Sequence, residues 1–390
     1  MEKLKKLAKL DIKKIDIKKL LTSDLSSLKR QKKVTIDLQP RKPLISKKVV
    51  SIDIGTQNIK VVVGKCSKNK IIIEKAFMFT SSVKDSNEDS LKDLKVLPKE
   101  IETVLSNNNI KVKSANCTGN STTIINREII VPIANEDELE TLVKFELQHY
   151  LPINMDDFIV QFSILEKINV EGIDKLRILG VIYPNKLAKN YMGVLKTANL
   201  KPNALDVNYN AIKKLIIHGD INSENDDDSQ KTIAVIDMGA ESLEVNIYTS
   251  HKLEFARIIK SGGKQIDINI AKAFSMNVIK AETKKIQQCD LMNYEKSEMA
   301  SLIKSEVDQW MEELGRIIQF FKNKKVGNDI SKILIHGGSS RLKGLEKYME
   351  VRFNTPVKHI NELNNVVFNK EVNSEDVDHY LNAIGAIIRF

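Results

Sequence analysis

Three short stretches, far apart along the chain, constrain its fold more than any other feature. Residues 49–60 read Val-Val-Ser-Ile-Asp-Ile-Gly-Thr-Gln-Asn-Ile-Lys, and residues 233–242 read Ile-Ala-Val-Ile-Asp-Met-Gly-Ala-Glu-Ser. Each is an apolar β-run that ends in Asp-x-Gly and is followed by a second β-branched run, which predicts a strand–turn–strand hairpin. Residues 333–345 read Ile-Leu-Ile-His-Gly-Gly-Ser-Ser-Arg-Leu-Lys-Gly-Leu and predict a strand that meets Gly-Gly before a helix.

The two hairpins are typical of a phosphate-binding site, although a lone Asp-x-Gly is usually an ordinary turn. Glycine lets the backbone approach a ligand closely, and the amides of such a turn can cradle phosphate oxygens. The aspartates at the strand ends suit a hydrated magnesium ion, because magnesium keeps most of its waters. Two hairpins about 180 residues apart therefore suggest two similar domains that grip a nucleotide phosphate from both sides. The Gly-Gly pair of the third stretch would lie against a flat adenine.

The order of these stretches resembles the phosphate 1, phosphate 2 and adenosine motifs of the actin-like ATPase superfamily, which includes actin, Hsp70, sugar kinases and FtsA. Lys60 follows Asp53 by seven residues, where actin-type chains carry a phosphate-contacting lysine. Residues 281–285, Ala-Glu-Thr-Lys-Lys, resemble the helix that contacts the ribose in FtsA-like and Hsp70-like proteins. There is no Walker A pattern, which disfavours a P-loop enzyme.

This resemblance implies an α/β, two-lobed actin-like ATPase fold built from duplicated ribonuclease H-like domains, with ATP and Mg²⁺ as cofactors. Asp53 and Asp237 are the candidate metal-binding residues. The candidate nucleotide-binding residues are Asp53, Gly55, Thr56, Gln57, Lys60, Asp237, Gly239, Ala240, Gly263, Glu282, Lys285, Gly337, Gly338, Ser339 and Arg341.

The net charge of +10 is concentrated at one end of the chain. Residues 1–48 hold 16 of the 61 Lys and Arg and 5 of the 51 Asp and Glu, so the remaining chain is close to neutral. The near-neutral charge of residues 49–390 argues against nucleic-acid binding by this part of the chain. The basic arm, residues 1–46, predicts either a solvated tail or contact with an anionic lipid surface or acidic partner.

Other sequence features are those of a globular cytoplasmic protein. No apolar run approaches the ~18 residues of a membrane span, and there is no signal-peptide h-region. Cys66, Cys117 and Cys289 are scattered, odd in number and without metal spacing, which favours reduced thiols in the cytoplasm. The six histidines form no cluster, so nothing supports a metalloenzyme. A length of 390 residues suits two domains.

A second block indicates which member of the superfamily this is. Residues 127–132 read Arg-Glu-Ile-Ile-Val-Pro, and residues 138–152 form an amphipathic helix that begins Glu-Leu-Glu and ends at Pro152. The block resembles the PilM proteins of type IV pilus assembly, whose pattern is Arg-x-Ile-x-Val-Pro, a Glu-Leu-Glu helix and Tyr-Ile-Pro-Phe-Pro. Here the last part reads Tyr-Leu-Pro-Ile-Asn, a departure from that pattern. The resemblance covers roughly Val49 to Phe390.

The PilM resemblance implies a domain layout without the small subdomain 1B of actin. Residues 1–46 are the arm, and residues 47–218 form domain I, comprising subdomain 1A with a 1C insertion at about 127–200. A polar connection, 219–230, leads to domain II, residues 231–390, comprising subdomain 2A with a 2B insertion at about 263–328. We expect the C-terminal helix to return towards domain I.

The same resemblance implies a cytoplasmic scaffold at the inner face of the cytoplasmic membrane, bound to the N-terminal peptide of the bitopic protein PilN. Pilus assembly ATPases are further expected partners. An FtsA-like division filament is the alternative, but such proteins usually end in a basic amphipathic membrane helix. A sugar kinase would need a catalytic aspartate poised over a substrate hydroxyl, and no motif supplies one.

Hydrolysis is expected to be slow or absent. Active members place a carboxylate or glutamine before the helix that links the domains, and Asn208 stands there in this chain. An amide cannot take a proton from the attacking water. Asp206 is the nearby alternative, because strand alternation would point it the same way as Asn208.

Overall fold

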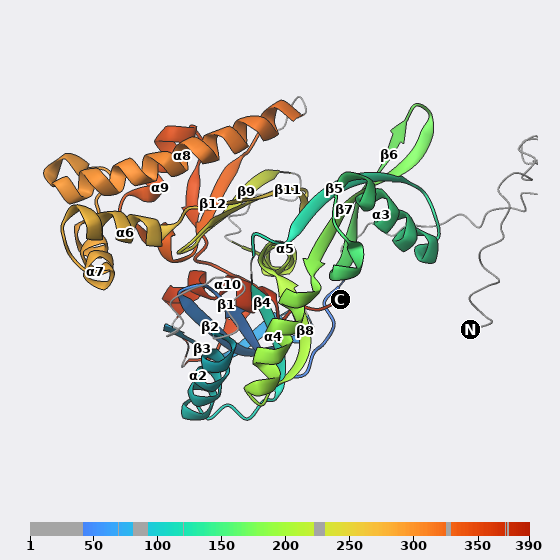
Figure 1. The fold of residues 1–390 in the computed structure, drawn as a ribbon, viewed down its shortest axis with the longest axis horizontal. Coiled ribbons are helices and arrows are strands. Elements are labelled where there is room, and N and C mark those ends of the chain that lie inside the picture. Colours follow the sequence, from blue (N-terminus) through green and yellow to red (C-terminus); the bar gives the residue numbers. More distant parts are fainter. Residues whose placement is uncertain are drawn as a thin grey trace, which may run out of the picture.

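The computed structural model describes residues 42–68, 70–80, 93–119, 121–221, 231–324, 329–370, 372 and 374–390. Most of the predicted basic arm and most of the polar connection, residues 222–230, lie outside the described residues. The chain forms two lobes with helix α5 (Asn208–His218) between them and a smaller third unit beside the first lobe (Figure 1).

Lobe I is built on a six-stranded sheet. Its strands, in spatial order, are β14 (Val366–Phe368), β3 (Lys70–Thr80), β2 (Asn58–Ser67), β1 (Val49–Ile54), β4 (Ser114–Gly119) and β8 (Lys201–Val207). β1, β2 and β3 form an antiparallel meander, while β4 runs parallel to β1. Helices α2 (Asp93–Asn107) and α4 (Asn185–Thr197) share an apolar core with one face of the sheet, and α5 packs on the other.

Lobe II repeats this arrangement. Its sheet has the spatial order β11 (Lys252–Ile259), β10 (Leu243–Thr249), β9 (Thr232–Met238), β12 (Lys332–His336) and β13 (Val357–His359). β9, β10 and β11 form an antiparallel meander, and β12 runs parallel to β9 as β4 does to β1. Both predicted Asp-x-Gly hairpins are therefore present at equivalent places in two similar sheets.

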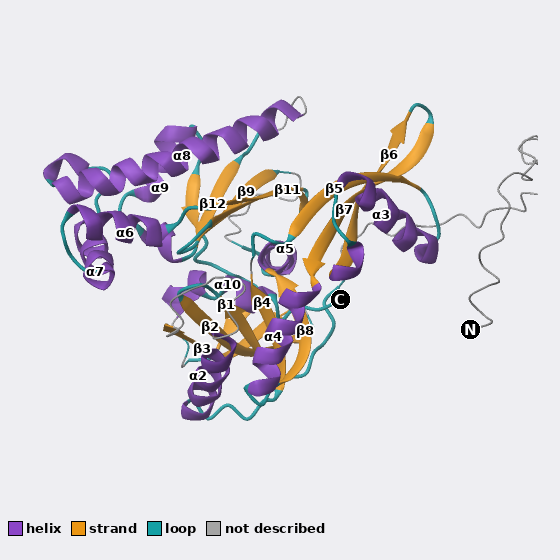
Figure 2. Cartoon of the chain, in the orientation of Figure 1, coloured by secondary structure: helices purple, strands orange, loops and turns teal. Residues whose placement is uncertain are grey.

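The helices of lobe II gather on one side of its sheet (Figures 1 and 2). Trp310 and Phe321 of the long helix α8 are fully buried in this core, which explains why the sequence sustains a helical apolar pattern over so many turns. The helical elements are α6 (Gly263–Ala273), α7 (Val278–Gln288), η5 (Tyr294–Lys296), α8 (Glu298–Lys324), η6 (Gly338–Arg341) and α9 (Leu345–Phe353).

The helix predicted directly after Gly337-Gly338 is instead a short 3₁₀ turn, η6, and α9 begins later, at Leu345. Gly344 separates the two with a φ of 84°. This left-handed conformation suits glycine and interrupts a right-handed helix.

The third unit is a separate three-stranded sheet with one helix, which we call the 1C unit. Its elements are β5 (Ile125–Pro132), α3 (Glu136–Tyr150), η3 (Met155–Asp157), β6 (Phe158–Val170) and β7 (Ile173–Pro184). A capping box between Asn135 and Glu138 starts α3, and Leu139, Val143 and Leu147 bury its inner face. We expected this insertion to reach about residue 200, but α4 and β8 belong to the core and sheet of lobe I.

Arg177 links the 1C unit to lobe II. Arg177 on β7 donates to Glu166 at 2.7 Å inside the 1C unit and to Glu254 of β11 at 2.7 Å in lobe II. Arg177 is largely buried, and its guanidinium also lies 3.2 Å from Glu128. The three carboxylates raise the pKa of Arg177 although burial acts against them, so its charge is permanent.

The C-terminal segment returns to lobe I, beginning with β14. It continues through η7 (Ser374–His379) to α10 (Leu381–Gly385), which packs on α5 and on β1. α10 is shorter than the helix predicted for residues 380–390. Gly385 permits close packing, because a Cβ there would lie 2.2 Å from the carbonyl oxygen of Ala211. No helix in the described ranges is long and apolar enough to cross a membrane.

Candidate functional site

A cavity of about 420 Å³ lies between the two lobes, where the two Asp-x-Gly hairpins face each other. Every residue assigned to nucleotide binding from the sequence lines it, including the turn residues of both hairpins and the Gly337-Gly338 pair. Asn208, at the first turn of α5, also lines it, whereas Asp206 does not. The fold therefore gathers residues from well-separated stretches of the sequence around one space.

The two hairpin turns that line this cavity contain close backbone contacts at their glycines. A Cβ on Gly55 would lie 2.7 Å from the carbonyl oxygen of Asn58, and one on Gly239 would lie 2.9 Å from that of Ser242. The amide of Gly239 closes its turn by donating to the Ser242 carbonyl at 3.0 Å. These close approaches explain why each turn needs glycine.

Asp53 and Lys60 form the charged floor on the lobe I side. Their carboxylate and ammonium are 3.4 Å apart, and Asp53 is only 2% exposed. Burial raises the pKa of Asp53, and the Lys60 charge offsets this only in part. Burial alone would lower the pKa of Lys60, but the charges of Asp53 and Asp237 outweigh it and raise that pKa. Lys60 is thus a fixed cation that faces both turns.

Asp237 holds the corresponding place on the lobe II side. Its Oδ2 accepts a hydrogen bond from Asn382 at 3.0 Å. Gly337 passes directly beside it with a φ of 91°, and a Cβ there would lie 2.5 Å from Asp237 Oδ1. The Gly337-Gly338 loop is therefore packed against the second Asp-x-Gly hairpin.

A second group of polar residues lines the cavity towards α7. Lys285 donates to Asp267 at 2.9 Å and to the carbonyl of Gly263 at 3.2 Å, which orders the start of α6. Gln57 of the first hairpin donates to Glu282 at 2.9 Å and so bridges the two lobes. Burial raises the pKa of Asp267 to about 6 despite the nearby Lys285.

Arg341 lines the cavity but is already held by carboxylates. It contacts Asp378 at 2.6 Å and Asp376 at 3.1 Å, both on η7. These contacts fix the loop after Gly337-Gly338 to the C-terminal segment.

The geometry fits a hydrated cation that arrives with a nucleotide better than a metal held by protein ligands alone. The described residues contain no group of three or more His, Cys, Asp or Glu able to hold a metal ion. Two carboxylates, Asp53 and Asp237, face a cavity whose glycine turns leave room for ligand oxygens. Magnesium in such sites keeps several waters and uses one or two carboxylates plus phosphate oxygens.

Comparison with known proteins identifies the family. A model of the family described as "Type IV pilus assembly protein PilM" matches residues 51–389, almost the whole described body.

The chain belongs to the PilM family.

Solved structures confirm the actin-like ATPase fold. A PilM-PilN type IV pilus biogenesis complex contains a chain that is 19% identical with a TM-score of 0.74, covering 87% of this chain and 97% of that one. The ethanolamine utilization protein EutJ from Carboxydothermus hydrogenoformans is 12% identical with a TM-score of 0.50, covering 88% and 90%.

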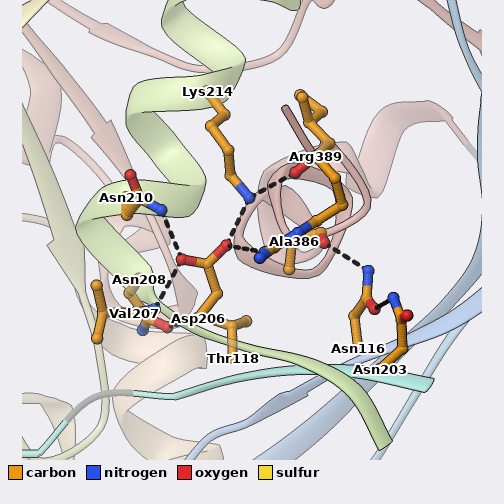
Figure 3. A network of polar contacts seen from close by, with 11 residues as sticks. Asn116, Thr118, Asn203, Asp206, Val207, Asn208, Asn210, Lys214, Ala386 and Arg389 are labelled. Atoms are coloured by element: carbon orange, nitrogen blue, oxygen red, sulfur yellow. Dashed lines mark hydrogen bonds and ion pairs between the residues drawn. The ribbon is translucent and has the colours of Figure 1, made fainter. Parts of the chain in front are cut away.

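Asp206, one of two catalytic candidates in this PilM-family chain, has different surroundings from those we expected (Figure 3). Its carboxylate accepts from Lys214 at 2.5 Å, from Asn210 at 2.7 Å and from Arg389 at 3.3 Å. Burial would raise the pKa of Asp206, but Lys214 and these hydrogen bonds together hold it below its usual range. Asp206 is therefore a structural carboxylate that stands apart from the cavity, and we withdraw it as a catalytic candidate.

Asn208 remains at the cavity wall. Its Oδ1 accepts a hydrogen bond from the Thr118 hydroxyl at 3.0 Å, so the amide is fixed in orientation (Figure 3). Strand alternation failed as a guide because β8 ends at Val207 and α5 begins at Asn208, so the two side chains leave different kinds of backbone.

Several residues that line the cavity were missed from the sequence, and two of them, Glu244 and Asn382, are buried polar residues. Glu244 on β10 is 4% exposed, and burial, aided by Asp237, raises its pKa to about 8. The available signal was a carboxylate in a strand, Leu-Glu-Val-Asn-Ile-Tyr, that directly follows the second Asp-x-Gly turn. Asn382 on α10 had no local signal, because only tertiary packing brings this helix to the cavity.

Proposed function

We propose that this PilM-family chain is an ATP-binding scaffold of type IV pilus assembly. In this proposal it lies at the inner face of the cytoplasmic membrane, recruited by the N-terminal tail of a PilN-like bitopic protein. The observation that carries the nucleotide part is the convergence of two Asp-x-Gly turns, Lys60 and the Gly337-Gly338 pair on one cavity.

In the proposed complex, the turn amides near Gly55 and Gly239 face the phosphates, and Lys60 neutralises their charge. Glu282 and Lys285 lie on the side that would take the ribose, while Gly337 and the following turn offer bare backbone to the base. Asp53 and Asp237 would hold the waters of a magnesium ion, which would neutralise the phosphates further. Each of these roles uses a group that the fold already orients, so little ordering is needed on binding.

The ATP proposal is tested by thermal unfolding. ATP with Mg²⁺ at about 100 times its dissociation constant is expected to stabilise the protein by about 2.7 kcal/mol, because it binds only the folded state. Asp53→Ala should remove most of this gain, whereas Asp174→Ala, at the exposed start of β7 in the 1C unit, should leave it intact. If millimolar MgATP leaves the melting temperature of nucleotide-free wild-type protein unchanged, ATP is not the ligand.

Turnover should be slow, because the cavity presents an amide where a proton acceptor would be needed. We expect Asn208→Glu to raise the rate of phosphate release, since positioning a general base typically contributes 10²–10⁴-fold. Asn208→Gln has the same added length without the carboxylate and should not raise the rate. A wild-type rate that equals that of a working ATPase would contradict this expectation.

We place the partner site on the 1C unit. Two aromatic residues of α3 are not part of its core: Phe145 is 58% exposed and Tyr150 is 52% exposed. Arg127 lies over the Tyr150 ring at 5.1 Å, so this face combines apolar and cationic groups. An extended peptide with one or two apolar anchors would suit it. The similar chain solved as a PilM-PilN complex supports PilN as the class of partner.

Titration calorimetry with the N-terminal peptide of a PilN-like protein tests the placement. The double substitution Phe145→Ser, Tyr150→Ser should weaken binding about tenfold or more, because buried aromatic anchors dominate such interfaces. Phe320→Ser, which changes an equally exposed aromatic residue on α8 of lobe II, is the matched control. Unchanged binding by the double variant would refute the placement.

Two further parts of the proposal rest on sequence alone. Pilus assembly ATPases are expected as additional partners. The basic arm is expected to add affinity for an anionic leaflet or an acidic partner, at up to ~1 kcal/mol per Lys or Arg near the surface.

A further inference from the structure

Asn382 is the cavity residue whose hydrogen bonding the nucleotide motifs do not explain. It comes from α10, in the C-terminal segment, and is 6% exposed. Its Nδ2 donates to Asp237 Oδ2 at 3.0 Å. Its Oδ1 is buried and, within the part of the chain that the structure describes, receives no hydrogen bond. Buried polar atoms are seldom left in this state, so the oxygen calls for a partner that a ligand would bring.

The chemistry of that oxygen limits what the partner can be. An amide oxygen only accepts hydrogen bonds, so it needs a donor. The phosphate oxygens of a nucleotide are acceptors as well and would repel it. The ribose hydroxyls are donors, but they belong on the other side of the cavity, near Glu282. The remaining donor expected beside Asp237 is a water molecule bound to a divalent cation, whose hydrogens are made more acidic by the metal charge.

The backbone around Asn382 is fixed on lobe I. The Ala386 carbonyl accepts from Asn116 at 2.8 Å (Figure 3). The Ile388 carbonyl accepts from Lys214 at 2.8 Å. Gly385 lets α10 sit directly on the backbone of α5. Asn382, anchored in lobe I, thus holds the Asp237 carboxylate of lobe II. Burial raises the pKa of Asp53 overall, and a hydrogen bond from the Asn382 amide partly opposes this.

We propose that Asn382 is a positioning residue of the nucleotide site: it orients Asp237 through Nδ2 and accepts, through Oδ1, a hydrogen bond from water on the divalent cation. The inference rests on the proposed function, because it assumes that a nucleotide with its cation enters this cavity. The consequence is that the site distinguishes between two forms of the nucleotide. Asn382 favours the magnesium complex of ATP over free ATP, because free ATP offers its Oδ1 no donor.

The test measures dissociation constants for the non-hydrolysable analogue AMPPNP by calorimetry, once with Mg²⁺ and once with EDTA. The ratio of the EDTA value to the Mg²⁺ value reports the preference for the cation complex. Asn382→Ala should lower this ratio about tenfold, the effect of losing one charge-assisted hydrogen bond. Asn382→Asp keeps an accepting oxygen and should leave the ratio at or above that of wild type.

Asn203→Ala is the control. Asn203 donates to Asn116 at 2.7 Å in the network that supports the C-terminal segment, but it does not line the cavity (Figure 3). Its ratio should equal that of wild type. The inference is overturned if Asn382→Ala leaves the ratio unchanged, whether the affinities stay the same or fall equally with and without Mg²⁺. Failure of the wild-type protein to bind AMPPNP at all would instead refute the proposed function.

Discussion

Replacing Asp206 with alanine is expected to lower the free energy of unfolding by about 3–5 kcal/mol, the usual cost of leaving one charge of a buried ion pair without its partner. Lys214 would remain, with a side chain only 3% exposed and with Arg389 close by. The substitution would also release Asn210 and loosen the start of α5. Because Asp206 lies apart from the cavity, the variant that stays folded should still bind ATP.

Urea unfolding measures this effect, with Asp376→Ala as the control. Asp376 also pairs with an arginine, but in an exposed setting, so its loss should cost less than about 1 kcal/mol. The pH dependence has a defined sign. The pKa of Asp206 is lower in the folded protein, so its stabilisation is present above the ordinary value of 3.8 and is lost as the pH falls below it. If Asp206→Ala has the stability of the wild-type protein but no longer hydrolyses ATP, Asp206 is again a catalytic candidate.

Gly337→Ala is expected to damage both stability and nucleotide binding. The combination of φ 91° and ψ 166° is essentially restricted to glycine and costs another residue about 1–3 kcal/mol. The added Cβ would also meet Asp237 Oδ1 at 2.5 Å and the Met238 carbonyl at 2.8 Å, and overpacking of this kind costs a further 1–3 kcal/mol or so. Asp237 would have to move, so the stabilisation by MgATP should be lost even where the protein remains folded.

The adjacent glycine provides a matched control. A Cβ on Gly338 would meet no atom within 4 Å, so Gly338→Ala should change the stability of the nucleotide-free protein by less than about 0.5 kcal/mol. Its effect on ATP binding then reports whether the base lies against this backbone. Equal stabilities for the two alanine variants would contradict the steric explanation.

Local patterns were sufficient to predict the elements that carry the motifs. The β-branched runs on either side of each Asp-x-Gly gave the β1–β2 and β9–β10 hairpins, and the apolar spacing before Pro152 gave α3. These predictions succeeded because backbone conformation and glycine geometry at those places are set by neighbouring residues. The motif residues among those that line the cavity followed for the same reason.

The features that could not be predicted depend on contacts between residues far apart in the sequence. The different roles of Asp206 and Asn208 depend on Lys214 and Arg389, which reach Asp206 from α5 and from the C-terminal segment. Asn382 contacts Asp237 across 145 positions of sequence, and no local pattern marks such a pair. The early return of the chain to lobe I through β14 was missed because a strand of three residues carries too little periodicity to predict.

The Arg177–Glu254 contact makes the 1C unit and lobe II mechanically dependent on each other. Glu254 lies on β11, which pairs with β10, and β10 pairs with the strand that carries Asp237. A ligand that shifts lobe II must either carry the 1C sheet with it or separate a largely buried guanidinium from one of its three carboxylates. Two ligands on these units would then be thermodynamically linked, and reciprocity requires each to change the affinity of the other by the same factor.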